Sequence, residues 1–183
     1  MELNGINVNI PSFTYDSLYI FIHAWHHFVS SGVGLRQMAD WMLHLHTYAD
    51  RLETGIIKSV LQRMNILEEW QTFGWVLVNK FGMPETEFPF YTGKYAHKGE
   101  KLYRQLMIDG HCGRETRLKF LGEQLYLFPF SRPAHGRLRQ KIYTLCRLTF
   151  NTIQLAKLFP GYALREYIYS LIQHTITPAQ TLA

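Results

Sequence analysis

Apolar residues recur every three or four positions along most of this chain, and this spacing constrains the fold more than any other feature. After Pro11 they fall on one face of a helix, at Leu18, Phe21, Ile22, Trp25, Phe28 and Val29. Ser12 or Thr14 can cap the start of that helix, and Gly32 lies just past its end. The pattern therefore predicts an amphipathic helix directly after the first proline.

A second helix is predicted over residues 35–52. Its apolar positions are Leu35, Met38, Ala39, Met42, Leu45, Ala49 and Leu52. The connection "SSGVG" between the two helices is short, so we expect them to form a helical hairpin.

Helical patterns continue to the end of the chain. One segment covers residues 55–63, and Asn65, with Glu68 three residues on, is predicted to cap the next helix, which ends at Gly82. Four more are predicted at residues 97–109, 114–127, 136–158 and 162–174. The sequence thus predicts an all-α fold, mostly a bundle of seven or eight helices. It forms a single helical domain over residues 12–176, with a frayed tail at 177–183.

Residues 1–11 have a different pattern. Leu3, Ile6, Val8 and Ile10 alternate with polar residues, and Asn4-Gly5 can form a turn. We therefore expect a short N-terminal β-strand or hairpin. Because a lone strand is not stable, it either packs on the helices or belongs to a sheet that this chain does not supply.

The composition of the chain indicates its expected cellular location and the charge of its possible partners. The chain of 183 residues has two cysteines, and they do not form a C-x-x-C pair. No signal peptide and no apolar run long enough to cross a membrane is present, so the expected location is cytoplasmic. The net charge of +5 permits an anionic partner without requiring one.

Five of the nine histidines lie between residues 21 and 46. His23 and His27 are one helical turn apart, a spacing that can bind zinc, with Asp40, His44 or His46 as a third ligand. Ala24 stands where a zinc protease needs glutamate, so metalloprotease chemistry is not supported. The alternative is that the histidines share hydrogen bonds with the second helix, and no metal ligand is assigned.

Arg36, Asp40 and His44 form a polar stripe at intervals of four residues. Arg36 and Asp40 can pair as a structural node if the hairpin buries them, or Arg36 can bind a phosphate group of a ligand. The candidate residues for a ligand site or a structural polar node are therefore His23, His27, Arg36, Asp40 and His44.

Positive charge is concentrated in residues 94–147, the basic region, which holds twelve lysines and arginines against four acidic residues. Such a region can bind nucleotide or nucleic acid, or can consist of solvated helix faces. The candidate anion-binding residues are Arg114, Arg117, Arg137, Arg139 and Lys141.

A family resemblance is carried by a motif in the predicted hairpin, H-x-x-x-H-F followed by G-x-G-L-R-x-x-x-D-W. Its residues are His23, His27, Phe28, Gly32, Gly34, Leu35, Arg36, Asp40 and Trp41. The motif resembles the C-terminal helical region of the uncharacterised nucleotidyltransferase-like proteins common in Bacteroides and related bacteria. The resemblance implies a nucleotide pocket beside the hairpin in the full-length family.

The chain departs from that family at the catalytic centre. Nucleotidyltransferases hold magnesium with a D-x-D or D-x-E pair on a strand. None of the four aspartates here, Asp16, Asp40, Asp50 and Asp109, has an acidic residue two positions away. We therefore expect no catalytic residues and no cofactor in this chain, with magnesium only if a catalytic domain is supplied upstream. Residues 1–11 would then be the remnant edge of a missing catalytic sheet, with Met1 inside a longer protein.

The first functional hypothesis is a helical accessory domain, not catalytic by itself, that completes a substrate pocket or binds a partner. That partner would be a nucleotide or other anionic ligand, a catalytic nucleotidyltransferase domain or a second copy of the chain. The alternative is a stand-alone interaction module that binds an anionic partner through residues 94–147. A third is an enzyme that uses His23, His27 and Asp40, with a metal ion or as acid and base.

Overall fold

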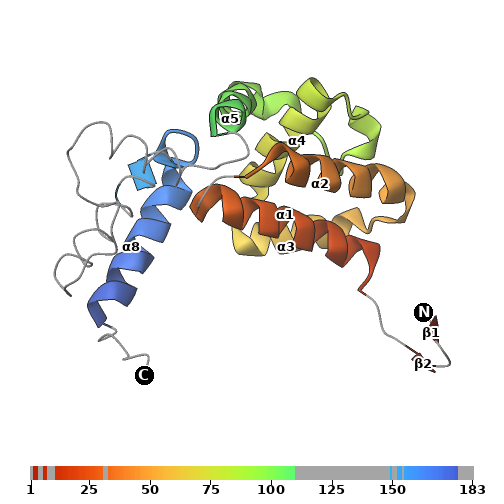
Figure 1. The fold of residues 1–183 in the computed structure, drawn as a ribbon, viewed down its shortest axis with the longest axis horizontal. Helices are drawn as coiled ribbons and strands as arrows, with labels where there is room; N and C mark the ends of the chain where they lie inside the picture. The colour runs from red at the N-terminus through yellow and green to blue at the C-terminus, as the bar shows by residue number, and fades with distance from the viewer. Residues whose placement is uncertain are drawn as a thin grey trace. The chain divides into compact units, whose positions relative to one another are not determined.

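The protein is all-α with a short N-terminal hairpin, so the predicted fold class is confirmed (Figure 1). The computed structural model describes residues 2–3, 6–7, 11–30, 33–109, 149, 152–153 and 155–176. The chain divides into two compact units, unit 1 over residues 1–113 and unit 2 over residues 114–183. Each unit is described by itself, and a single helical domain over 12–176 stays a prediction.

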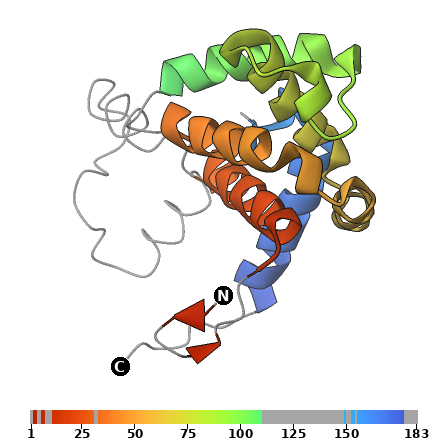
Figure 2. The same cartoon turned by 90° about the vertical axis from the view of Figure 1, so that its right-hand side faces the viewer.

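Five α-helices build the described part of unit 1. They are α1 (Phe13–Ser30), α2 (Leu35–Tyr48), α3 (Thr54–Met64), α4 (Leu67–Phe81) and α5 (Ala96–Asp109). Short 3-10 turns lie between them, at η1 (Ala49–Arg51), η2 (Glu85–Glu87) and η3 (Gly93–Tyr95). Helix α2 packs alongside α1 in the predicted hairpin, and α4 packs on both α3 and α5 (Figures 1 and 2).

In unit 2 the structure describes helix α8 (Pro160–Ile176). Its start lies slightly earlier than the predicted residue 162, because proline is well suited to the first position of a helix. The backbone N–H of Ala163 donates to the carbonyl of Phe159 at 2.9 Å, which closes the first turn. The predicted helix at 114–127, most of the one at 136–158 and the tail 177–183 lie outside the described residues.

The N-terminal hairpin consists of β1 (Glu2–Leu3) and β2 (Ile6–Asn7). The strands pair antiparallel, with Glu2 opposite Asn7 and Leu3 opposite Ile6. Among the described residues this is a sheet of two strands. The predicted hairpin is therefore present, and its origin in a larger catalytic sheet stays a prediction.

Two of the predicted helix-capping residues are confirmed by the structure, and one is not. The Ser12 hydroxyl accepts a hydrogen bond from the backbone N–H of Tyr15 at 3.4 Å, and Gly82 ends α4 with a left-handed φ of 79°. The predicted capping box at Asn65 is wrong. Asn65 has a φ of 56° and ends α3, while α4 starts after Ile66 with no side-chain cap. Asparagine tolerates the left-handed conformation, and here that preference decides its position.

The core of unit 1 is a cluster of aromatic rings from three helices. Phe21 of α1 is fully buried, with its ring centroid 5.1 Å from Trp41, 5.0 Å from Trp70 and 5.8 Å from Phe73. Trp41 and Trp70 meet edge to face at 4.9 Å. Their indole N–H groups have no hydrogen-bond partner in the part of the chain that the structure describes. Full burial of an apolar side chain such as that of Phe21 contributes about 1.5–3 kcal/mol.

The predicted apolar face of α2 needs a correction. Its buried residues are Met38, Trp41 and Leu45, whereas Leu35 and Ala39 are exposed. The buried face is therefore rotated toward Trp41, because the large indole fills the space beside Phe21 and Trp70. This rotation turns Arg36 and Asp40 to the opposite side of the helix, and both are exposed there.

Candidate functional site on the α1–α2 hairpin

The histidine pair of α1 is formed by His23 and His27, whose side chains meet on the helix surface. Their Nε2 atoms are 3.1 Å apart, and the two rings lie edge to face with centroids 4.5 Å apart. One Nε2–H group donates the hydrogen bond and the Nε2 atom of the other ring accepts it. The spacing of one helical turn therefore does bring both imidazoles to one point.

Tyr19 extends this pair along the helix and was not predicted. Its ring stacks beside that of His23, with centroids 6.0 Å apart and planes within 15°. Tyr15, Tyr19, His23 and His27 follow each other at intervals of four residues, and both tyrosines are exposed. That interval was the signal in the sequence, because residues four apart share one side of a helix.

Arg36 and Asp40 lie on the solvent side of α2. The Arg36 Nε and Asp40 Oδ2 atoms are 3.9 Å apart, and the two side chains are 88% and 63% exposed. An ion pair this long and this exposed contributes at most about 0.5 kcal/mol to stability. The hairpin therefore does not bury the pair, and the guanidinium of Arg36 faces water.

His44 and His46, also on α2, join elements that are distant in sequence. The His44 Nε2–H group donates to the backbone carbonyl of Phe13 at 3.0 Å, which ties α2 to the first turn of α1. The Nδ1 atom of His46 is 2.6 Å from Oε2 of Glu87 in η2. His44 thus has the structural role that was one of its two predicted alternatives.

Within the described residues there is no group of three or more His, Cys, Asp and Glu side chains that could hold a metal ion. Asp40, His44 and His46 are therefore not placed as a third ligand for the His23–His27 pair. Among the helices that the structure describes, none has the length and hydropathy needed to span a membrane.

The basic region lies mostly outside the described residues, and so do all five candidate anion-binding residues, Arg114, Arg117, Arg137, Arg139 and Lys141. Two of its described cations are already engaged with carboxylates. Lys98 forms an ion pair with Glu68, and the Arg104 Nε is 3.3 Å from Glu100 Oε1. The Lys98 pair joins α5 to α4, whereas the Arg104 pair lies within α5.

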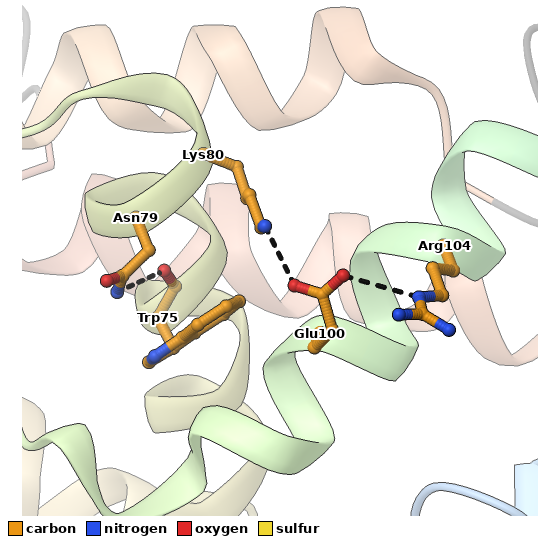
Figure 3. A network of polar contacts seen from close by, with 5 residues as sticks. All are labelled: Trp75, Asn79, Lys80, Glu100 and Arg104. Atoms are coloured by element: carbon orange, nitrogen blue, oxygen red, sulfur yellow. Dashed lines mark hydrogen bonds and ion pairs between the residues drawn. The ribbon is translucent and has the colours of Figure 1, made fainter.

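Glu100 is the centre of a polar network between α4 and α5 (Figure 3). Its carboxylate receives Lys80 Nζ of α4 at 2.8 Å as well as Arg104 of its own helix. The same ammonium lies 5.5 Å from the ring centroid of Trp75 and 5.1 Å from that of Tyr103. The hydrogen bond from Lys80, and then that from Arg104, lowers the pKa of Glu100 against the opposing effect of burial.

Comparison of the chain with protein-family models, with curated proteins and with solved structures finds no match. The resemblance to nucleotidyltransferase-like proteins therefore stays a hypothesis that rests on the hairpin motif. The structure adds the position of the motif residues in the fold, except Gly32, which lies outside the described residues.

Proposed function

We propose that this chain is a helical accessory module of the nucleotidyltransferase-like type, without catalytic carboxylates of its own. In this proposal the α1–α2 hairpin completes a nucleotide pocket or docks on a catalytic domain in the cytoplasm of a bacterium. The observation that carries the proposal is that the motif residues differ in burial. Its aromatic residues Phe28 and Trp41 are buried, whereas Arg36 and Asp40 are exposed.

The buried half of the motif has a sufficient structural reason. Trp41 packs against Phe21 and Trp70, and Phe28 meets Phe73 with centroids 5.5 Å apart. The exposed half has no such reason, because the Arg36–Asp40 pair contributes little to stability. A contact with a second molecule is the remaining role for a guanidinium held at this position.

The chemistry of Arg36 favours an anionic ligand. Its planar guanidinium can donate two parallel hydrogen bonds to one phosphate group. Asp40, 3.9 Å away, can orient the guanidinium without neutralising it through a tight bond. Nucleoside triphosphates supply such phosphate groups, and the magnesium that accompanies them would be held by the carboxylates of a catalytic domain.

The test is calorimetric titration of the whole chain with ATP and GTP in the presence of magnesium. We expect binding that weakens by about tenfold in Arg36→Gln, the loss of one charged hydrogen-bonding group. Arg63→Gln is the matched control, since Arg63 is another exposed arginine on the surface of a helix, in α3. Equal affinities of Arg36→Gln and the parent would contradict a role of Arg36 in binding. Arg36→Gln should also melt at the parent temperature, because its ion pair is exposed.

The alternative is an interaction module that binds an anionic partner through residues 94–147, and the charge of that region favours it. The triple variant Arg137→Glu, Arg139→Glu and Lys141→Glu separates the two proposals. Under the alternative, this variant loses a salt-dependent affinity for nucleotide or RNA, while Arg36→Gln keeps it. Under the accessory-module proposal, the two variants behave in the opposite way.

A further inference from the structure

The His23–His27 pair has the separation of two ligands on one metal ion. The two Nε2 atoms are 3.1 Å apart. Imidazole nitrogens bind zinc at about 2.0–2.1 Å. With an angle at the metal between 90° and the tetrahedral value, two bonds of that length place the nitrogens about 2.8–3.4 Å apart. An ion can therefore replace the shared hydrogen without movement of the helix backbone.

The ring orientations permit the same exchange. The two ring planes meet at 83°, edge to face, with the Nε2 atoms in contact. The χ2 torsion of histidine is broad, so modest rotation of the rings aims both lone pairs at one point. Tyr19, stacked beside His23, supports that ring from the preceding turn of α1.

We propose that His23 and His27 form a surface site for a late first-row divalent ion, Cu²⁺, Ni²⁺ or Zn²⁺. Imidazole nitrogen suits these ions, and affinity should follow the order in which Cu²⁺ exceeds Ni²⁺ and Zn²⁺. The described residues supply no third protein ligand, so water takes the other positions and the ion exchanges readily. The site is independent of the accessory-module proposal, which rests on Arg36.

The experiment is calorimetric titration of the full chain with NiCl₂ and ZnCl₂ at neutral pH. We expect a site of one ion per chain that is weakened by about tenfold or more in His23→Gln and in His27→Gln, because each variant keeps a single imidazole. His97→Gln is the control, since His97 is exposed on α5 and lies outside the pair. It should bind the ion as the parent does.

A second readout separates metal binding from a purely structural hydrogen bond. The ion links two successive turns of α1, so it should raise the melting temperature of the parent and of His97→Gln but not that of His23→Gln. Equal metal affinity of the parent and the double variant His23→Gln/His27→Gln would overturn the proposal. So would a parent that takes up no ion at millimolar concentration.

Discussion

Gly74 shows how closely the elements of unit 1 approach each other. It lies in the middle of α4, where alanine normally stabilises a helix by about 0.5–1 kcal/mol relative to glycine. A Cβ atom at this position would overlap the ring of Phe88. Overpacking of this kind costs about 1–3 kcal/mol, so we expect Gly74→Ala to lower the free energy of unfolding, measured by urea denaturation.

The control for that variant is Gly55→Ala in α3. A Cβ atom there meets nothing within 4 Å. We expect this variant to unfold at an equal or higher urea concentration than the parent. If Gly74→Ala unfolded at the same urea concentration as Gly55→Ala, the Phe88 ring would have room to move. The segment that holds Phe88 would then pack less tightly on α4 than described.

Thr14 is a second residue whose role is set by one contact. Its buried hydroxyl accepts a hydrogen bond from the backbone N–H of Glu53 at 3.0 Å and so connects α1 to the start of α3. Thr14→Val keeps the shape but leaves that N–H without its acceptor, at a cost of about 1–3 kcal/mol. Thermal unfolding of the variant checks this.

Thr47→Val is the matched substitution on α2. Thr47 is exposed, and its hydroxyl donates to the carbonyl of Leu43 within the same helix. Water can replace this bond, so we expect a change within about 0.5 kcal/mol. Equal losses in both variants would mean that the effect comes from valine in a helix and not from the contact with Glu53.

At the scale of elements, the contact between α4 and α5 should depend on pH through Glu100. Its pKa is lowered in the folded chain, first by the hydrogen bond from Lys80 and then by that from Arg104. The ionised carboxylate therefore stabilises the fold fully above the ordinary glutamate pKa of about 4.3. This stabilisation is lost as the pH falls from there through the lowered folded pKa.

The measurement is the melting temperature of the parent and of Glu100→Gln between neutral and acidic pH. We expect the variant to melt lower at neutral pH and the difference to vanish at the acidic end. Glu85→Gln serves as control, because the Glu85 side chain is exposed and forms no ion pair with a described residue. A difference between parent and Glu100→Gln that is the same at every pH would contradict the role of the charge.

The elements also show which features the sequence could predict. Helices α1 to α5 were predicted from the apolar spacing, because that spacing is local and each helix buries one face. The prediction that Asn65 caps the start of α4 was wrong. Asparagine is common at both ends of helices, and only the packing of the neighbouring helices determines which end it occupies. The rotation of α2 toward Trp41 depends on rings from α1 and α4, which no local pattern contains.

In the candidate site, too, some contacts could be predicted from the sequence and others could not. The meeting of His23 and His27 follows from their spacing along one helix. The partners of His44 and His46 are Phe13 and Glu87, 31 and 41 residues away, and only the packed fold brings them together. Sequence spacing therefore predicts pairs within an element, whereas contacts between elements require the structure.

At the scale of the whole molecule, the division into two units can be tested by truncation. The aromatic core around Phe21, the hydrogen bonds of Thr14 and His44, and the Glu100 network all join residues of unit 1. We therefore expect a fragment of residues 1–113 to fold by itself and to melt cooperatively, as followed by the near-ultraviolet circular dichroism of its tryptophans.

The full chain supplies the comparison for that fragment. If the units fold separately, limited proteolysis of the full chain should release a resistant product that ends near residue 113 and melts like the fragment. A fragment without cooperative melting would instead mean that unit 1 needs residues beyond 113 to complete its core. That result would favour the single helical domain over residues 12–176 that the sequence predicts. Because His23, His27, Arg36 and Asp40 all lie in unit 1, a folded fragment should also keep the metal and nucleotide binding proposed for them.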